Sequence, residues 1–139
     1  MFGIRSKKLA HPQVQGSDSG DKAQGDWAEE LACQWLVEQG LVLRDRNFRT
    51  RYGEIDLIMQ SGDCLIFVEV RYRKTVKFGS AEESITSKKC QKLTAAAQGY
   101  LLANSYESNT PIRFDAVALS PSRDSYLGCT INWIQNILT

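Results

Sequence analysis

The chain has 139 residues, of which 42% are hydrophobic, and its 17 basic and 16 acidic residues leave a net charge of +1. This composition predicts one soluble globular domain, and no apolar stretch approaches the ~20 residues of a membrane-spanning helix. The basic N-terminus lacks the apolar segment of a secretory signal, so we expect a cytoplasmic protein with no membrane partner. The four cysteines are scattered and the only histidine is His11, so neither a zinc site nor histidine-based catalysis in the folded domain is expected.

The N-terminal residues 1–21 are rich in Gly, Ser, Gln and Lys and show no periodicity, which predicts a disordered tail before a single domain over residues 22–139. A helix is expected from about Asp21 to Gln39, ended by Gly40. Its apolar residues recur at spacings of three and four. Glu29 lies at the edge of that apolar face, whereas Glu30 is expected to point to solvent.

The rest of the chain alternates strand and helix patterns. Strands are predicted over Leu41–Arg49, over two halves of Gly53–Arg73, over Ile112–Leu119 and over Thr130–Ile134. A second helix is predicted from about Ser87 to Ala103, with Ser84, Thr86 or Ser87 as its N-cap. The order predicts an α/β fold with a mixed sheet flanked by helices. Its third and fourth strands should run parallel, because a helix connects them.

Three acidic residues interrupt the strands of the central hairpin: Glu54, Asp56 and Glu69. Strands rarely contain Asp, and side chains alternate between faces with a period of two. A turn at Gly62-Asp63 places Asp56 opposite Glu69, and a turn at Ser61-Gly62 places Glu54 there instead. Both turns put all three carboxylates on one face, whereas a three-residue loop would separate Asp56 from Glu69.

Carboxylates that face each other across a sheet repel, by about 1 kcal/mol at ~4 Å in water and about 4 kcal/mol at an effective dielectric of 20. A bridging cation or a shared proton would relieve this repulsion. A few hard oxygen ligands suit Mg²⁺ or Mn²⁺, so Asp56 and Glu69 are predicted metal ligands, with Arg71 on the same face as Glu69. The alternative is a set of ion pairs with nearby arginines.

Basic residues surround this hairpin, since eleven of the seventeen lie between Arg44 and Lys92. Arginine forks suit phosphate oxygens, and interleaved aromatic residues such as Phe48 and Tyr52 can stack on bases. Protection of an edge strand is the alternative use. Lys88 begins the second helix, where a cation opposes the helix dipole, which suggests a functional use. The predicted nucleic-acid-binding residues are Arg46, Arg49, Arg51, Arg73 and Lys74.

Together, the motifs AEELA, NFR, GEIDLI, FVEVRYR and RFDAV make the chain resemble the uncharacterised bacterial proteins of the YraN type. That family is similar in pattern to the restriction-endonuclease-like fold, and especially to archaeal Holliday-junction resolvases. The resemblance implies that Glu29 is the helix carboxylate and that Asp56 and Glu69 are metal ligands. It places Arg71 where related nucleases have a lysine.

The resemblance implies a Mg²⁺-dependent phosphodiesterase that acts on nucleic acid, with branched or damaged DNA as the favoured substrate and a homodimer as the expected assembly. The expected catalytic residues are Glu29, Asp56, Glu69, Arg71 and Lys88. Arg71 stays protonated and cannot act as a general base, which leaves a second hypothesis open. In that hypothesis the protein keeps the nuclease fold and binds nucleic acid without cutting it. A protein-interaction role without nucleic acid is a third.

Overall fold

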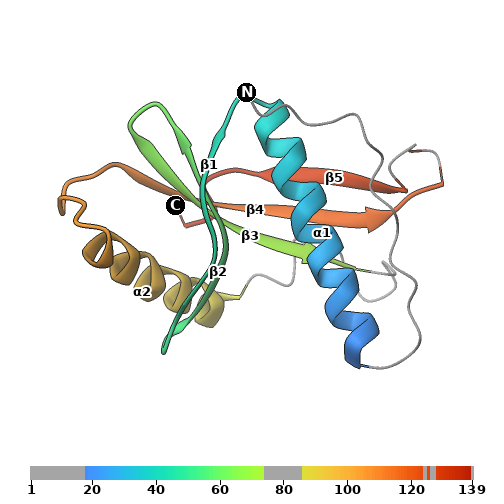
Figure 1. Ribbon diagram of the computed structural model, residues 1–139, viewed down its shortest axis with the longest axis horizontal. Coiled ribbons are helices and arrows are strands. Elements are labelled where there is room, and N and C mark those ends of the chain that lie inside the picture. Colours follow the sequence, from blue (N-terminus) through green and yellow to red (C-terminus); the bar gives the residue numbers. More distant parts are fainter. Residues whose placement is uncertain (1–17, 74–85, 124, 126–127, 139) are drawn as a thin grey trace.

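The computed structural model describes residues 18–73, 86–123, 125 and 128–138, and in them it places two helices and five strands in the predicted order (Figure 1). Of the tail predicted for residues 1–21, residues 1–17 lie outside the described residues, as does the loop residue Lys74, whereas residues 18–21 belong to the first helix and not to a tail. The elements are α1 (Asp18–Glu38), β1 (Val42–Thr50), β2 (Gly53–Ser61), β3 (Cys64–Tyr72), α2 (Ser87–Ala103), β4 (Ile112–Pro121) and β5 (Cys129–Ile134).

The five strands form one mixed sheet in the order β1-β2-β3-β4-β5. All neighbouring strands are antiparallel except β3 and β4, which are parallel and are connected through α2. A parallel connection requires a long crossover, and a helix supplies it. The predicted α/β class and the predicted parallel pair are therefore confirmed.

The hairpin of β2 and β3 has the first of the two registers considered above, because Ser61 pairs with Cys64 and Leu57 pairs with Val68. The turn is therefore Gly62-Asp63, and the alternative turn at Ser61-Gly62 is wrong. Gly62 has a φ of +60°, a left-handed conformation that glycine adopts without a steric penalty. This register makes Asp56 and Glu69 the next pair beyond Leu57 and Val68.

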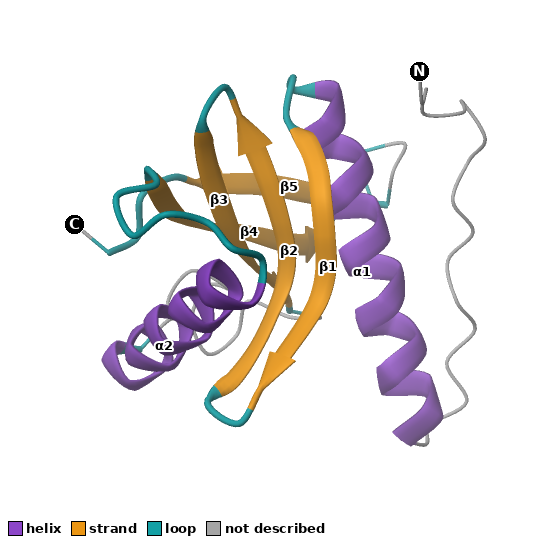
Figure 2. Cartoon of the chain, turned by 60° about the vertical axis from the view of Figure 1, so that its left-hand side comes forward, coloured by secondary structure: helices purple, strands orange, loops and turns teal. Residues whose placement is uncertain are grey.

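The two helices cover opposite faces of the sheet (Figure 2). On the α1 side, Leu31 and Leu36 pack with the sheet residues Leu57 and Val68. On the α2 side, the buried cluster is formed by Ile55, Ile58, Leu65, Phe67, Leu93, Ala96, Ala97, Tyr100 and Phe114. Both layers bury apolar side chains that recur with the expected helix and strand periods.

Helix boundaries agree with the sequence pattern to within a few residues. α1 begins at Asp18 rather than at about Asp21, and α2 has the predicted bounds. Among the three candidate N-caps, Thr86 holds this position, because its Oγ1 accepts a hydrogen bond of 3.2 Å from the backbone N–H of Lys89. In the described part of the chain, neither helix has the length and apolarity needed to span a membrane.

Strict alternation along β2 is broken at one place. The sequence pattern puts Ile55 on the same face as Leu57, but the structure packs Ile55 with Ile58 on the α2 side and Leu57 on the α1 side. The expected face of Ile55 is therefore wrong. The strand must change its twist between Ile55 and Leu57, which is where Asp56 lies.

A buried carboxylate that is not part of this hairpin fastens the other end of the sheet. Asp115 of β4 is fully buried and accepts hydrogen bonds from the Arg113 guanidinium, from Trp133 Nε1 at 2.8 Å and from the backbone N–H of Asn136 at 2.9 Å. Paired and hydrogen-bonded in this way, a buried charge is tolerated. Asp115 thus ties β4 to β5 and to the segment that follows.

Candidate active site

The candidate site lies where the hydrogen-bonded ladders around Asp56 are interrupted. Pairing between β1 and β2 runs from Arg46–Leu57 to Phe48–Ile55 and steps over Asn47 and Asp56. Asn47 has a φ of +54°, the left-handed conformation that Asn adopts more readily than most residues. On the other side, the paired residues of β2 and β3 end at Leu57 and Val68.

The Asp56 side chain takes over a hydrogen bond at this break. Its Oδ2 accepts the backbone N–H of Val70 at 2.8 Å, a donor that a continued ladder would have paired with backbone. The carboxyl group is thereby fixed on the sheet beside Glu69. Asp is rare in strands, and here its side chain accepts a hydrogen bond from a backbone N–H that would otherwise pair with backbone. The regular pairing of β2 with β3 therefore ends at this position.

Burial, and after it the neighbouring charge of Glu69, together raise the pKa of Asp56 to about 8. The hydrogen bond from Val70 acts in the opposite direction and does not offset them. Glu29 of α1 is hydrogen-bonded to Asp56, and burial and the charge of Glu54 raise the pKa of Glu29 above its usual value. At neutral pH the Asp56 carboxyl therefore keeps its proton and donates a hydrogen bond to the Glu29 side chain.

Glu69, the acid next to Asp56, is buried, with only 2% of its surface exposed. Its Oε2 forms ion pairs with Arg71 Nη2 at 3.0 Å and with Lys89 Nζ at 3.2 Å. Its Oε1 is buried and has no hydrogen-bond partner among the described residues, and the same holds for Arg71 Nε. Unpaired buried polar atoms are uncommon and cost about 1–3 kcal/mol each. Both atoms thus have capacity for a ligand.

The lysine that reaches the acids is Lys89, whereas the predicted Lys88 is exposed to solvent. The helical period contained the signal that distinguishes them. Lys89 precedes the buried Leu93 by four residues and the buried Ala96 by seven, so it lies on the inward face of α2. Lys88 is rotated by one residue away from that face.

The predicted nucleic-acid-binding arginines differ in their surroundings. Arg46 forms an ion pair of 2.7 Å with Glu30, and Arg49 forms one of 3.2 Å with Glu54. The sequence pattern puts Glu30 toward solvent; its side chain is 39% exposed but is held by this ion pair. Burial tends to raise the pKa of Glu30, but hydrogen bonds from Arg46 and Gln34 outweigh it and lower the pKa. Arg51 and Arg73 are exposed.

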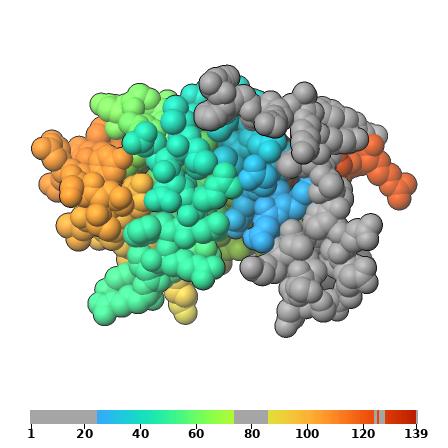
Figure 3. All heavy atoms as spheres, viewed as in Figure 1, coloured from blue at the N-terminus to red at the C-terminus, as the bar shows by residue number. Residues whose placement is uncertain are grey.

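A cavity of about 680 Å³ opens beside the acids. α1 and β1 lie side by side on the face where it opens (Figure 3). Two of the cavity's wall residues, Glu29 and Glu54, are acids whose charges raise the pKa of Asp56. Its walls are Gly25, Asp26, Glu29, Glu30, Arg46, Asn47, Arg49 and Glu54.

The structure therefore brings Glu29, Asp56, Glu69 and Arg71 into one cluster and adds Lys89 to it. Within residues 18–73 and the other described segments, no three His, Cys, Asp or Glu side chains form a ready-made metal site. Two carboxylates are nonetheless a donor set that Mg²⁺ uses, because this ion commonly keeps waters and takes substrate phosphates as further ligands. Asp56 and the free Oε1 of Glu69 fit that description.

Comparison with known proteins finds one family model and relatives of similar length. The model of the uncharacterised protein family UPF0102 matches residues 28–119. The chain is similar to a UPF0102 protein of Saccharophagus degradans, with 49% identity over 115 residues that cover 83% of this chain and 92% of the relative. It is also similar to one of Nitrosomonas europaea, with 48% identity over 86% of this chain and 95% of the relative.

Proposed function

Since this chain belongs to the uncharacterised protein family UPF0102, we propose its function from the site itself: a metal-dependent phosphodiesterase that acts on nucleic acid. The observation that supports this proposal best is the pair of neighbouring acids, the half-buried Asp56 and the buried Glu69, at the point where the sheet ladder ends. Withdrawing two acids from water is costly unless the site serves a ligand that compensates them.

In this proposal the cation is Mg²⁺ or Mn²⁺, held by Asp56 and by Oε1 of Glu69. When bound, it supplies Lewis-acid stabilisation of the negative charge on the phosphate. Asp56 must first give up its proton. Val70 then keeps the Asp56 carboxylate in place through its backbone N–H, so little reorientation is needed.

Other residues of the chain act on the phosphate and on the attacking water. Arg71 and Lys89 present positive charge at Glu69, and the unpaired Nε of Arg71 is available to a phosphate oxygen. Glu29 would accept a proton from water, because a carboxylate with a raised pKa is a better base near neutral pH. Arg71 itself stays protonated, so it stabilises negative charge and takes no part in proton transfer.

We propose DNA as the substrate, with branched or damaged structures favoured. The order of elements, α-β-β-β-α-β, and the placement of Asp56, Glu69 and Glu29 support the likeness to restriction-endonuclease-like nucleases and Holliday-junction resolvases that the motifs suggested. Exposed Arg51 and Arg73 offer additional phosphate contacts. The resolvase likeness also suggests a homodimer.

The test is cleavage of end-labelled single-stranded, duplex and four-way-junction DNA with Mg²⁺ or Mn²⁺. Asp56→Asn and Glu69→Gln should each lower the cleavage rate by at least about 100-fold and leave binding intact, because they remove charge from the reaction centre. Asp63→Asn and Glu38→Gln, both exposed acids, are the matched controls. Lys89→Met should lower the rate more than Lys88→Met does. Full activity in Asp56→Asn would overturn the assignment.

A non-catalytic nucleic-acid-binding protein is the second candidate, and the pairing of Glu69 favours it. Arg71 and Lys89 together supply two positive charges to this one carboxylate, so the site reaches charge balance without a metal. This candidate predicts salt-sensitive binding that does not respond to Mg²⁺. Binding of every DNA form with no cleavage under either metal would establish it over the first.

A further inference from the structure

The turn between β1 and β2 is held rigid although it lies at the surface. Thr50 Oγ1 accepts a hydrogen bond of 3.0 Å from the backbone N–H of Tyr52 and donates one of 3.2 Å to the carbonyl oxygen of Gly53. Gly53 has a φ of +153°, and Lys92 of α2 lies 3.6 Å from the place that a Cβ on Gly53 would occupy. The turn is therefore stabilised by hydrogen bonds among its own residues, and its Gly53 end lies against Lys92 of α2.

Tyr52 is one of few large apolar side chains exposed in the described part of the chain, with 49% of its surface accessible. Arg51 orients its ring, because Arg51 Nη2 donates a hydrogen bond of 2.8 Å to the Tyr52 hydroxyl and Arg51 Cζ lies 4.9 Å from the ring centroid. This cation–π contact covers part of the ring. The remaining exposed ring surface is thus fixed in direction before any ligand arrives.

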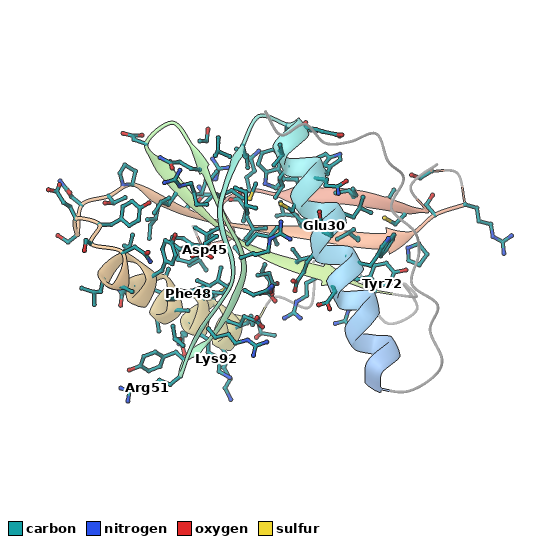
Figure 4. The ribbon with its side chains drawn as sticks, in the orientation of Figure 1. Glu30, Asp45, Phe48, Arg51, Tyr72 and Lys92 are labelled. Atoms are coloured by element: carbon teal, nitrogen blue, oxygen red, sulfur yellow. The ribbon has the colours of Figure 1, made fainter. Side chains whose placement is uncertain are left out.

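Positive charge surrounds this ring. Arg51 and Lys92 lie close together at the end of the β1–β2 hairpin, beside the start of α2 (Figure 4). Lys88 lies four residues before Lys92, so the two exposed lysines share one side of the helix. The nearest acid along the strand, Glu54, is already paired with Arg49. No acid among the described residues forms an ion pair with Arg51, Lys88 or Lys92, and an aromatic ring among such cations matches the chemistry of a nucleic acid, whose bases stack and whose phosphates are anionic.

The position of the turn relative to the acids is also suitable. Tyr52 precedes Asp56 by four residues, and at ~3.3 Å per strand residue the two are separated by about 13 Å. One strand of a duplex advances ~3.4 Å per nucleotide, so this spacing corresponds to about four nucleotides. A substrate strand whose phosphate is at the acids can therefore reach the turn.

We propose that Arg51 and Tyr52 form a stacking platform for an unpaired nucleobase of the substrate, with Lys88 and Lys92 contacting the adjoining phosphates. This inference rests on the proposed function and deepens it, because it selects substrates with unpaired bases. In a continuous duplex both faces of each base are covered by neighbouring base pairs. A ring at the surface can stack only on a base that has left the helix, in a single strand, a flap or a branch.

The test is binding without metal, in EDTA, so that cleavage does not enter. Single-stranded and flap oligonucleotides carrying 2-aminopurine, as DNA and as RNA, are titrated with the protein at fixed salt and compared with a fully paired duplex. Stacking quenches this base, so wild type should lower its fluorescence in the unpaired substrates. Tyr52→Ala should abolish the quenching and weaken binding to these substrates about 5- to 100-fold, while Tyr52→Phe should retain both.

Leu102→Ala is the matched control, because Leu102 is 82% exposed at the far end of α2, and it should behave as wild type. Affinity for the paired duplex should change less than twofold in Tyr52→Ala. An equal loss for duplex and single strand, or quenching that survives in Tyr52→Ala, would overturn the platform. Cleavage is measured separately with Mg²⁺. Quenching without cleavage would refute the phosphodiesterase but support the stacking platform. Cleavage without quenching would refute the stacking platform but support the phosphodiesterase.

Discussion

Asp56 is the acid whose ionisation this fold opposes most clearly, because burial and the charge of Glu69 raise its pKa to about 8. It is held in the sheet by a single backbone hydrogen bond from Val70, close to the buried Glu69 and to Glu29 of the covering helix. The protein tolerates this arrangement by retaining a proton on Asp56. A protonated pair and a cation-bound pair are two solutions to the same repulsion, and both the pH and the metal concentration decide between them.

Stability should therefore depend on pH through Asp56. Its pKa is about 8 in the folded protein and 3.8 as a free side chain, so the folded state binds this proton more tightly than the unfolded state does. The contribution is fully present below about pH 4 and is lost as the pH rises through about 8. Between pH 5 and 7 the free energy of unfolding should fall by about 1.4 kcal/mol for each unit by which the pH rises.

Denaturant unfolding at several pH values, without metal, checks this prediction. The free energy of unfolding of wild type should fall relative to that of Asp56→Asn as the pH rises, because the amide does not titrate. Asp63→Asn should keep the wild-type slope, since Asp63 is exposed in the turn. A difference between wild type and Asp56→Asn that stays constant from pH 5 to 8 would contradict the raised pKa.

At the scale of elements, the pairing of β1 with β2 has two irregularities, a register shift between Leu43 and Asp45 and an unpaired rung at Asn47 and Asp56, and the second of them shapes the site. Asn47 is in the left-handed region, and the pairing of the two strands steps over it and over Asp56. Both neighbouring rungs keep their register, so the irregularity turns side chains without shifting the strands. It moves Ile55 to the α2 side and leaves the Asp56 carboxyl at the break.

Substitutions at Asn47 should reveal this backbone requirement. Asn47→Gly should be close to neutral, because glycine adopts positive φ freely, whereas Asn47→Val should lower the free energy of unfolding by about 1–2 kcal/mol. Arg44→Val is the control, since Arg44 is exposed on the same strand and has no positive φ. Thermal or denaturant unfolding distinguishes these outcomes. An Asn47→Val protein as stable as Arg44→Val would show that the strand relaxes without strain.

The element that could be read most fully from sequence is the β2–β3 hairpin. Its alternating apolar residues and its Gly62-Asp63 turn fix the register locally, and the structure has one of the two registers derived from them. Asp115 shows the opposite case. Arg113, two residues away on the same strand, is a donor that the strand period can indicate, but Trp133 and the backbone N–H of Asn136 are distant in sequence and only the fold brings them to Asp115.

At the scale of the whole molecule, the candidate site joins three layers. The sheet supplies Asp56 and Glu69, α1 supplies Glu29, and α2 supplies Lys89. The helices lie on opposite faces of the sheet (Figure 2), so these groups can meet only at the place where the pairing of β2 with β3 ends. The break in the ladders is thus the structural condition for the cluster.

A divalent cation should stabilise the whole protein in a pH-dependent way. Mn²⁺ or Mg²⁺ at 100 times its dissociation constant should raise the free energy of unfolding by about 2.7 kcal/mol. The shift in Tm should be larger at pH 8 than at pH 6, because the cation competes with the proton on Asp56.

Thermal unfolding with and without metal measures this shift, and Asp56→Asn should abolish it while Asp63→Asn retains it. An equal shift in both variants would assign the effect to another site. No shift in wild type at either pH would favour the non-catalytic candidate, in which Arg71 and Lys89 balance Glu69 permanently.

The sequence by itself determined the order of the elements, the bounds of α2 and the parallel pair of strands, and it limited the two-residue hairpin turn to two registers, of which the structure has one. These features follow from local periodicity, turn residues and chain connectivity, which act between residues near in sequence. Only the tertiary structure decided that Lys89 rather than Lys88 reaches Glu69, that Glu30 pairs with Arg46, and that Ile55 changes faces. Those outcomes depend on how each helix is seated and rotated against a twisted sheet, and side-chain packing across layers sets that geometry.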